Sequence, residues 1–293
     1  MSAQPEALIN ATIQFDAVTY SVNGTSRIPA SHSARPAKAK EKILVRDIRL
    51  SIAESETVVL LGRSGSGKTT LLRLINRMLE PSSGTVLVQG RATTQWNPYA
   101  LRRSIGYVIQ EAGLFPHFTV EQNIALVPGL EKWEKPRIDT RVRELLKLVG
   151  LDGGDFAARY PRQLSGGQRQ RVGVARALAA DPQILLMDEP FGALDPVTRA
   201  ELQKEFAALA RRLGKTIVFV THDLREALLL ATRIVLLEHG KIVAQDAPEN
   251  FLQVKHPEVR AFASCLDTDG APGNVAGSRS DADEGLAGGG GQP

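Results

Sequence analysis

The sequence is nearly without cysteine, since Cys265 is the only one among 293 residues. A single thiol excludes an internal disulfide and a cysteine-built metal site, and it is typical of a chain that works in a reducing cytoplasm. Long apolar runs are also lacking: nowhere do about 18 apolar residues follow one another, so we expect no membrane-spanning segment. The first residues show no basic stretch followed by an apolar one, so we expect no signal peptide.

A strong charge imbalance is missing as well, because the formal net charge is only +4. The basic residues gather at 27–42 and the acidic ones at 266–293. We interpret 21–42 as a flexible basic surface loop and 264–293 as a disordered acidic and glycine-rich tail. Contact of the basic loop with nucleic acid or an anionic membrane is the less favoured alternative. We therefore expect no nucleic-acid partner.

The spacing of apolar residues predicts an α/β protein with a parallel sheet. The run Ile184–Met187 is continuously apolar and bounded by breakers, which favours a strand buried on both faces. Further strands are predicted at 12–20, 43–52, 57–61, 104–109 and 216–220, with a terminal hairpin at 235–237 and 242–243. Helices are predicted after residue 69 (Leu71, Leu72, Ile75, Met78), within 119–159, at 165–178, at 196–213 and near 248–263.

The strand at 57–61 runs directly into a phosphate-binding loop. Residues 62–69 match G-x-x-x-x-G-K-[ST], and a helix follows, which is the context that this motif requires. Glycines let the loop place its N–H groups around phosphate, Lys68 brings a cation to the outer phosphates, and Thr69 is spaced to bind Mg²⁺. The residues expected at the nucleotide are Gly62, Arg63, Ser64, Gly65, Ser66, Gly67, Lys68, Thr69 and Thr70.

A second glycine-rich turn opens the helix at 165–178. Ser165 and Gln168 fit a capping box, which is the purely structural interpretation. Capping does not explain Gly166 and Gly167, since each glycine in a helix costs about 1 kcal/mol relative to alanine. We favour access of a phosphate to bare N–H groups at the helix N-terminus, and therefore a second phosphate site.

Four residues lie at the C-terminal ends of predicted parallel strands, at one edge of the sheet: Gly62, Gln110, Asp188 and His222. Open α/β sheets bind ligands at this edge. We expect Asp188 to bind Mg²⁺ with Thr69, and Glu189 to be the base for a water that attacks the γ-phosphate. A structural acid or histidine at a strand end is the alternative for each.

These motifs together resemble the ATP-binding subunit of an ABC transporter over residues 12–263. The resemblance includes the Walker A loop, the LSGGQ signature (164–168), Walker B (184–189), a D-loop at Asp195 and a switch histidine, His222. It implies a P-loop NTPase (RecA-like) core, an N-terminal antiparallel β subdomain and an inserted α-helical subdomain at about 111–170. Asp195 is also a natural N-cap before Pro196.

The resemblance further implies cofactors and partners. ATP and Mg²⁺ would lie between two subunits in a head-to-tail homodimer, with Walker A of one facing the signature of the other. Tyr20 would stack on adenine, with Phe15 as the alternative, and Gln110 would bind the metal and connect the site to the helical subdomain. Integral membrane permease subunits and, indirectly, a solute-binding protein would complete a transporter on the cytoplasmic side of the membrane.

Within the family, segments such as IGYVIQEAGLFPHFTVEQNIALVP are similar to importers of quaternary amines, namely glycine betaine, choline and related osmoprotectants. Importers of other small solutes (an amino acid, a polyamine, a sulfonate) remain an alternative, and a soluble ABC-type ATPase acting on nucleic acid or ribosomes is a third. The length leaves no room for the regulatory CBS domains of some relatives, so gating through them is not expected. Ser55 stands where the family usually has glycine.

Overall fold

The computed structural model describes residues 11–23, 41–110, 112–151 and 154–268. Its strands are β1 (Ala11–Asn23), β2 (Glu41–Ala53), β3 (Thr57–Leu61), β4 (Ser83–Val88), β5 (Arg91–Ala92), β6 (Ile105–Val108), β7 (Ile184–Asp188), β8 (Thr216–Thr221), β9 (Arg233–Glu238) and β10 (Lys241–Asp246). Its helices are α1 (Lys68–Ile75), α2 (Pro98–Ser104), α3 (Val120–Leu130), α4 (Lys135–Leu148), α5 (Gly154–Ala157), α6 (Gly166–Leu178), α7 (Pro196–Leu213), α8 (Leu224–Leu230), α9 (Pro248–Phe251) and α10 (Pro257–Thr268).

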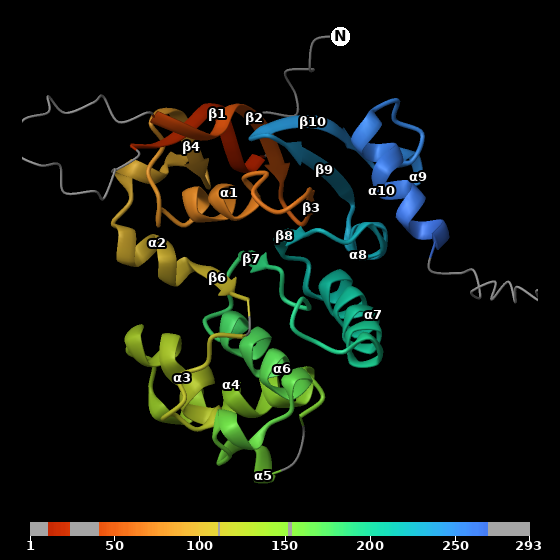
Figure 1. Cartoon of the computed structure of the whole chain (residues 1–293). Helices are drawn as coiled ribbons and strands as arrows, with labels where there is room; N and C mark the ends of the chain where they lie inside the picture. Colours follow the sequence, from red (N-terminus) through yellow and green to blue (C-terminus); the bar gives the residue numbers. More distant parts are fainter. Residues whose placement is uncertain (1–10, 24–40, 111, 152–153, 269–293) are drawn as a thin grey trace, which may run out of the picture.

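The centre of the molecule is a six-stranded sheet in the order β10-β9-β3-β8-β7-β6 (Figure 1). All pairs are parallel except β10 with β9. Strand β3 is buried along its whole length, and its side chains alternate between two cores: Val58 and Leu60 on one face, Val59 and Leu61 on the other. Burial on both faces explains the continuous apolar runs in the sequence.

A second, antiparallel sheet has the order β2-β1-β4-β5. Its inner side chains, including Val18 and Ile48, share one core with α1 and with one face of the central sheet. This is the predicted N-terminal β subdomain, and it covers the sheet beside the phosphate-binding loop.

Helices α3 to α6 form a lobe of their own on the far side of β6 and β7 (Figure 1). The predicted stripe on α4 is buried at Val142 and Leu145, and α6 buries Val172 and Ala175 against it. The inserted helical subdomain is thus present, but α6 continues to Leu178 and carries the chain back to β7.

Several predicted boundaries were wrong. Helix α1 ends at Ile75, because Asn76 caps it and its side chain accepts from the N–H of Met78, which is about half exposed. The region 248–263 forms two helices, α9 and α10, rather than one. Helix α2 was missed, although Asn97 is a good N-cap and Pro98 a good first residue.

Parts of the two segments predicted to lack structure belong to strands and a helix. Strand β1 extends to Asn23 and β2 begins at Glu41, so only 24–40 of the predicted loop lies outside the described residues. Helix α10 continues to Thr268, and 269–293 of the predicted tail lies outside them too. Within the part of the chain that the structure describes, no helix combines the length and the apolar character needed to cross a lipid bilayer.

Candidate nucleotide site

The phosphate-binding loop joins β3 to the N-terminus of α1. Gly65 and Gly67 have φ of 79° and 104°, in the left-handed region that favours glycine. A Cβ on Gly67 would lie 2.6 Å from Cγ1 of Val45 on β2, so the neighbouring sheet also requires glycine there. The loop therefore delivers free N–H groups at the start of α1, where an anion is favoured.

The Lys68 side chain lies inside this loop. Its Nζ donates to the carbonyl oxygens of Gly62 at 2.7 Å and Arg63 at 3.0 Å, and the residue is 5% exposed. Burial lowers the pKa of the Lys68 ammonium, while the Glu189 and Asp188 carboxylates oppose this shift. Oγ of Ser66 is buried without a partner among the described residues. A cation and an unpaired hydroxyl in one loop suit a phosphate.

The predicted metal ligands are in contact. Oγ1 of Thr69 donates to Oδ1 of Asp188 at 2.9 Å, which joins α1 to the end of β7. Burial raises the pKa of the Asp188 carboxyl, and the hydrogen bond from Thr69 opposes the shift. Hydroxyl and carboxylate oxygens are the ligands that Mg²⁺ prefers, usually completed by water and phosphate oxygens. The donor set therefore fits Mg²⁺ bound together with a nucleotide.

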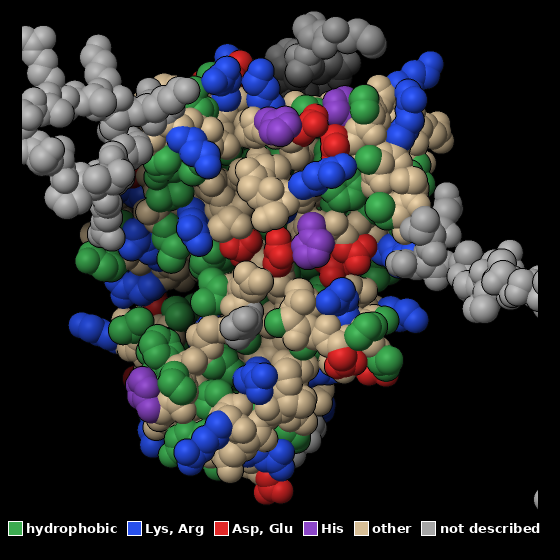
Figure 2. Space-filling model, viewed as in Figure 1, with side chains coloured by type: hydrophobic (Ala, Val, Ile, Leu, Met, Phe, Trp, Pro, Cys, Tyr) green, Lys and Arg blue, Asp and Glu red, His purple; other side chains and the backbone are tan. Residues whose placement is uncertain are grey.

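Glu189 and His222 meet beside this pair. Nδ1 of His222 lies 3.2 Å from Oε2 of Glu189. Glu189 has φ of 45°, a left-handed conformation that costs a non-glycine residue of order 1–3 kcal/mol and that clusters at functional sites. Its N–H bonds the carbonyl of Val220, so the turn after β7 is fixed to β8. Acidic and histidine side chains also gather in the middle of this face (Figure 2).

The remaining residues expected at the nucleotide come from different sheets, since Gln110 follows a strand of the central sheet and Tyr20 lies in the antiparallel sheet. Gln110 follows β6, which pairs with β7 in the register Val108 to Met187, and Gln110 is exposed. Tyr20 is half-buried on β1, opposite Val45, whose side chain faces Gly67. Phe15 is 2% exposed in the core and therefore has no ring face to offer a nucleotide.

The signature turn lies elsewhere. Ser165 and Gln168 form the predicted capping box, with both reciprocal hydrogen bonds present. Close packing against neighbouring side chains favours glycine at both positions, which the sequence did not indicate. A Cβ on Gly167 would lie 2.8 Å from Cγ2 of Thr198, and one on Gly166 would lie 3.3 Å from Leu194. Among the described residues, no hydrogen bond or ion pair joins 165–168 to the loop 62–69.

Asp195 caps α7 as predicted, accepting from the N–H of Thr198 at 3.0 Å. This backbone hydrogen bond lowers the pKa of the Asp195 carboxyl. The side chain is exposed, so it also remains free to face another subunit.

Sequence reasoning missed the part played by α10. Arg63 of the phosphate-binding loop pairs with Glu258 at 3.0 Å, which ties the loop to this helix. Phe262 and Cys265 line one cavity of about 510 Å³ together with Glu189 and His222. Ser64 of the loop lines the same cavity. Nothing in the local sequence of 257–268 indicated this contact.

A loop such as 62–69 alone defines a P-loop nucleotide-binding protein. The capped signature helix in a separate lobe, with the antiparallel sheet beside the loop, restricts the class to the ATP-binding cassettes. The profile of the ABC transporter family matches residues 45–192, and the chain belongs to this family. It is therefore a protein that binds ATP.

The chain is 55% identical over 212 residues to the glycine betaine/carnitine/choline transport ATP-binding protein of Bacillus subtilis, covering 72% of this chain and 56% of the relative. It is 56% identical over 208 residues to the glycine betaine uptake system ATP-binding protein of Escherichia coli, covering 71% and 67%. The chain thus spans between about half and two thirds of these relatives.

Solved structures agree on the fold. A dimeric ATP-binding cassette in a post-hydrolysis state, bound to ADP and phosphate, superposes with a TM-score of 0.67 at 32% identity. The match covers 80% of this chain and 98% of that one.

Proposed function

We propose that the chain is the ATP-hydrolysing subunit of an importer for quaternary amines such as glycine betaine, choline or carnitine. The observation that carries hydrolysis is the double contact at the end of β7, Thr69 with Asp188 and Glu189 with His222. The solute class rests on the names of the relatives, which are transport ATP-binding proteins for these compounds.

In this proposal Lys68 leaves the loop carbonyls to contact the outer phosphates, and the loop N–H groups hold the phosphate oxygens. Thr69 and Asp188 would bind Mg²⁺, with Gln110 as a further oxygen ligand, and the ion would neutralise charge between the β- and γ-phosphates. Glu189 accepts a proton from the attacking water, and His222 holds the Glu189 carboxylate and contacts the γ-phosphate.

A single chain does not complete the site, since its signature turn is not bonded to its own loop. We propose a head-to-tail homodimer in which Ser165, Gly166, Gly167 and Gln168 of one subunit contact the nucleotide on the loop of the other. Asp195, exposed at the start of α7, would face the partner subunit's loop. A relative of known structure is a dimer.

Adenine would stack on Tyr20, which lies opposite Val45, the residue whose side chain faces Gly67 of the loop. Stacking of a base on an aromatic ring is typically worth about 1–3 kcal/mol.

The permease subunits would dock beside Gln110. Phe115, His117 and Phe118 form an aromatic cluster in the segment between β6 and α3, with ring centroids 4.7 to 6.1 Å apart, and Phe115 is 42% exposed. A cytoplasmic loop of a membrane protein packed on this cluster would place the chain at the cytoplasmic face of the membrane. A movement of this cytoplasmic loop would be transmitted to the nucleotide site through Gln110.

The test is ATP hydrolysis by the chain co-expressed with its chromosomal neighbours and reconstituted in liposomes. Glycine betaine, choline, carnitine or proline betaine would be added with a matching solute-binding protein. Stimulation by a quaternary amine is expected, and Lys68→Ala in the same complex gives the background rate.

Two other outcomes would contradict parts of the proposal. Stimulation only by an amino acid, a polyamine or a sulfonate would keep the transporter and exclude the quaternary-amine assignment. Hydrolysis by the chain alone in response to nucleic acid or ribosomes, with no membrane protein co-purifying, would exclude the importer.

A further inference from the structure

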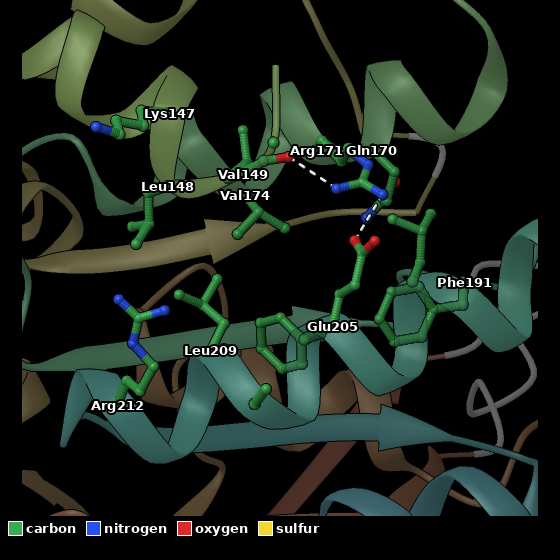
Figure 3. Close-up of a pocket in the computed structure, with 14 residues that line it drawn as sticks. Lys147, Leu148, Val149, Gln170, Arg171, Val174, Phe191, Glu205, Leu209 and Arg212 are labelled. Carbon is green, nitrogen blue, oxygen red and sulfur yellow. Dashed lines mark hydrogen bonds and ion pairs between the residues drawn. The ribbon is translucent and has the colours of Figure 1, made fainter. Parts of the chain in front are cut away.

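A cavity of about 320 Å³ lies between the helical lobe and the core, and no residue of the phosphate-binding loop lines it. Helices α4 and α6 line one side and α7 the other (Figure 3). The cavity also reaches Phe191, two residues after Glu189. Neither the nucleotide nor the proposed permease contact uses it.

The floor of the cavity is apolar. Val149 and Val174 come from the helical lobe, and Phe191 and Phe206 come from the core, each at most 6% exposed. An engineered apolar cavity of about 150 Å³ binds one benzene molecule. A cavity of about 320 Å³ is therefore large enough for a medium-chain aliphatic molecule.

One buried polar group in the wall lacks a partner. Gln170 on α6 is 4% exposed, and its Nε2 makes no hydrogen bond among the described residues. An unpaired buried donor costs about 1–3 kcal/mol, so an acceptor on a ligand would relieve this cost. The neighbouring Arg171 is already satisfied, because it donates to the Val149 carbonyl at 2.8 Å and pairs with Glu205 at 2.5 Å.

The mouth of the cavity is positive. Lys147 on α4 and Arg212 on α7 lie at the same end of it, away from the Arg171–Glu205 pair (Figure 3). Both are exposed, and neither is in an ion pair with a carboxylate of the described residues. Two unpaired cations above an apolar floor complement an anionic head on an apolar body.

We propose that this cavity binds a medium-chain carboxylate. The carboxylate lies between Lys147 and Arg212, the chain covers Val174 and Phe206, and a further oxygen on the chain accepts from Gln170 Nε2. Occupancy adds contacts among the signature helix α6, α7 and the segment after Glu189 to the Arg171–Glu205 pair that already connects the two helices. The bound carboxylate then holds the two lobes at one angle and slows ATP hydrolysis.

Binding is measured by equilibrium dialysis of the full chain with decanoate and 10-hydroxydecanoate below their micelle concentrations. Decyltrimethylammonium, with the same tail and the opposite charge, is the ligand control. We expect Arg212→Glu to weaken decanoate binding at least about tenfold. Arg211→Glu, the same charge change on the neighbouring exposed residue outside the cavity, should leave it unchanged.

Two further variants locate the ligand. Leu209→Trp should fill the cavity and abolish binding, and Gln170→Leu should remove any advantage of 10-hydroxydecanoate over decanoate. Equal losses in Arg211→Glu and Arg212→Glu, equal binding of the cationic amphiphile, or full binding to Leu209→Trp would overturn the site.

The effect on hydrolysis has its own measurement. Saturating decanoate should lower the ATPase rate of the wild-type chain at least about twofold and leave the Arg212→Glu rate unchanged. Binding at the cavity without any change in rate would overturn the regulatory role.

Discussion

Gly167 offers the sharpest test of how the signature helix is held. It is buried in the first turn of α6, where an alanine would suit the helical backbone. A Cβ there would nevertheless lie 2.8 Å from Cγ2 of Thr198 and 3.5 Å from Cδ1 of Leu202. The Thr198 methyl on α7 is therefore the main obstacle to Gly167→Ala.

The expected magnitude follows from two opposing terms. Overpacking a close contact costs about 1–3 kcal/mol. Replacing glycine by alanine in a helix gains up to about 1 kcal/mol. With the full gain of about 1 kcal/mol, Gly167→Ala should therefore lower the free energy of unfolding by about 0–2 kcal/mol. Thr198→Ser removes the obstructing methyl and keeps the hydroxyl, so in that background the same change should be neutral or stabilising by up to about 1 kcal/mol.

Urea unfolding of the wild type, both single variants and the double variant measures the coupling between the two sites, which should be about 1–3 kcal/mol. An equal loss of stability in both backgrounds would refute the packing explanation. ATPase activity answers a separate question. If Thr198→Ser rescues stability but not hydrolysis, the glycine is also needed for access to phosphate, as the sequence suggested.

Three other changes have defined outcomes. Glu189→Gln keeps the size of the side chain but not the base, so ATP binding should persist while turnover falls about 10²–10⁴-fold and the dimer accumulates on size-exclusion chromatography; normal turnover would remove Glu189 from the base role. The Glu226 carboxyl accepts hydrogen bonds from Thr221 and Gln203, and its burial raises its pKa. Glu226 therefore stabilises the fold at low pH, and this stabilisation is lost as the pH rises from about 4.3, the unfolded pKa, through the folded pKa. The stability of the wild type relative to Glu226→Gln should therefore fall between pH 4 and pH 8 in urea titrations, and a constant difference would contradict it. Thr119→Ala removes a capping box on α3 and should cost about 1 kcal/mol in the same assay, with Thr119→Ser close to wild type; equal losses in both would show that the hydroxyl does not carry the cap.

Roles that depend on near neighbours were predictable from the sequence. The loop 62–69, the Ser165–Gln168 box and the Asp195 cap each involve groups within a few positions, so the pattern contains the whole interaction. The contact between Glu189 and His222, which follow β7 and β8, was also predictable, because neighbouring parallel strands bring their carboxyl ends to one edge. The individual roles at the nucleotide remain proposals.

Periodicity failed where a short local contact ended an element. Met78 fits the apolar stripe of α1, but the side chain of Asn76 bonds its N–H and the helix stops. Likewise 248–263 is apolar enough for one helix, yet it divides into α9 and α10. The sequence pattern identifies a buried face better than it locates the residue at which a helix ends.

The sequence by itself determined the class of site, because the groups that bind phosphate belong to consecutive residues, 62–69. Tertiary structure alone decided three further points: the tie between Arg63 and Glu258, 195 residues apart; the contact of Gly167 with Thr198; and the cavity between α4, α6 and α7. Each depends on how separately formed elements pack. No local pattern encodes the distance between side chains on two helices, because that distance is set by the sum of all contacts in the core.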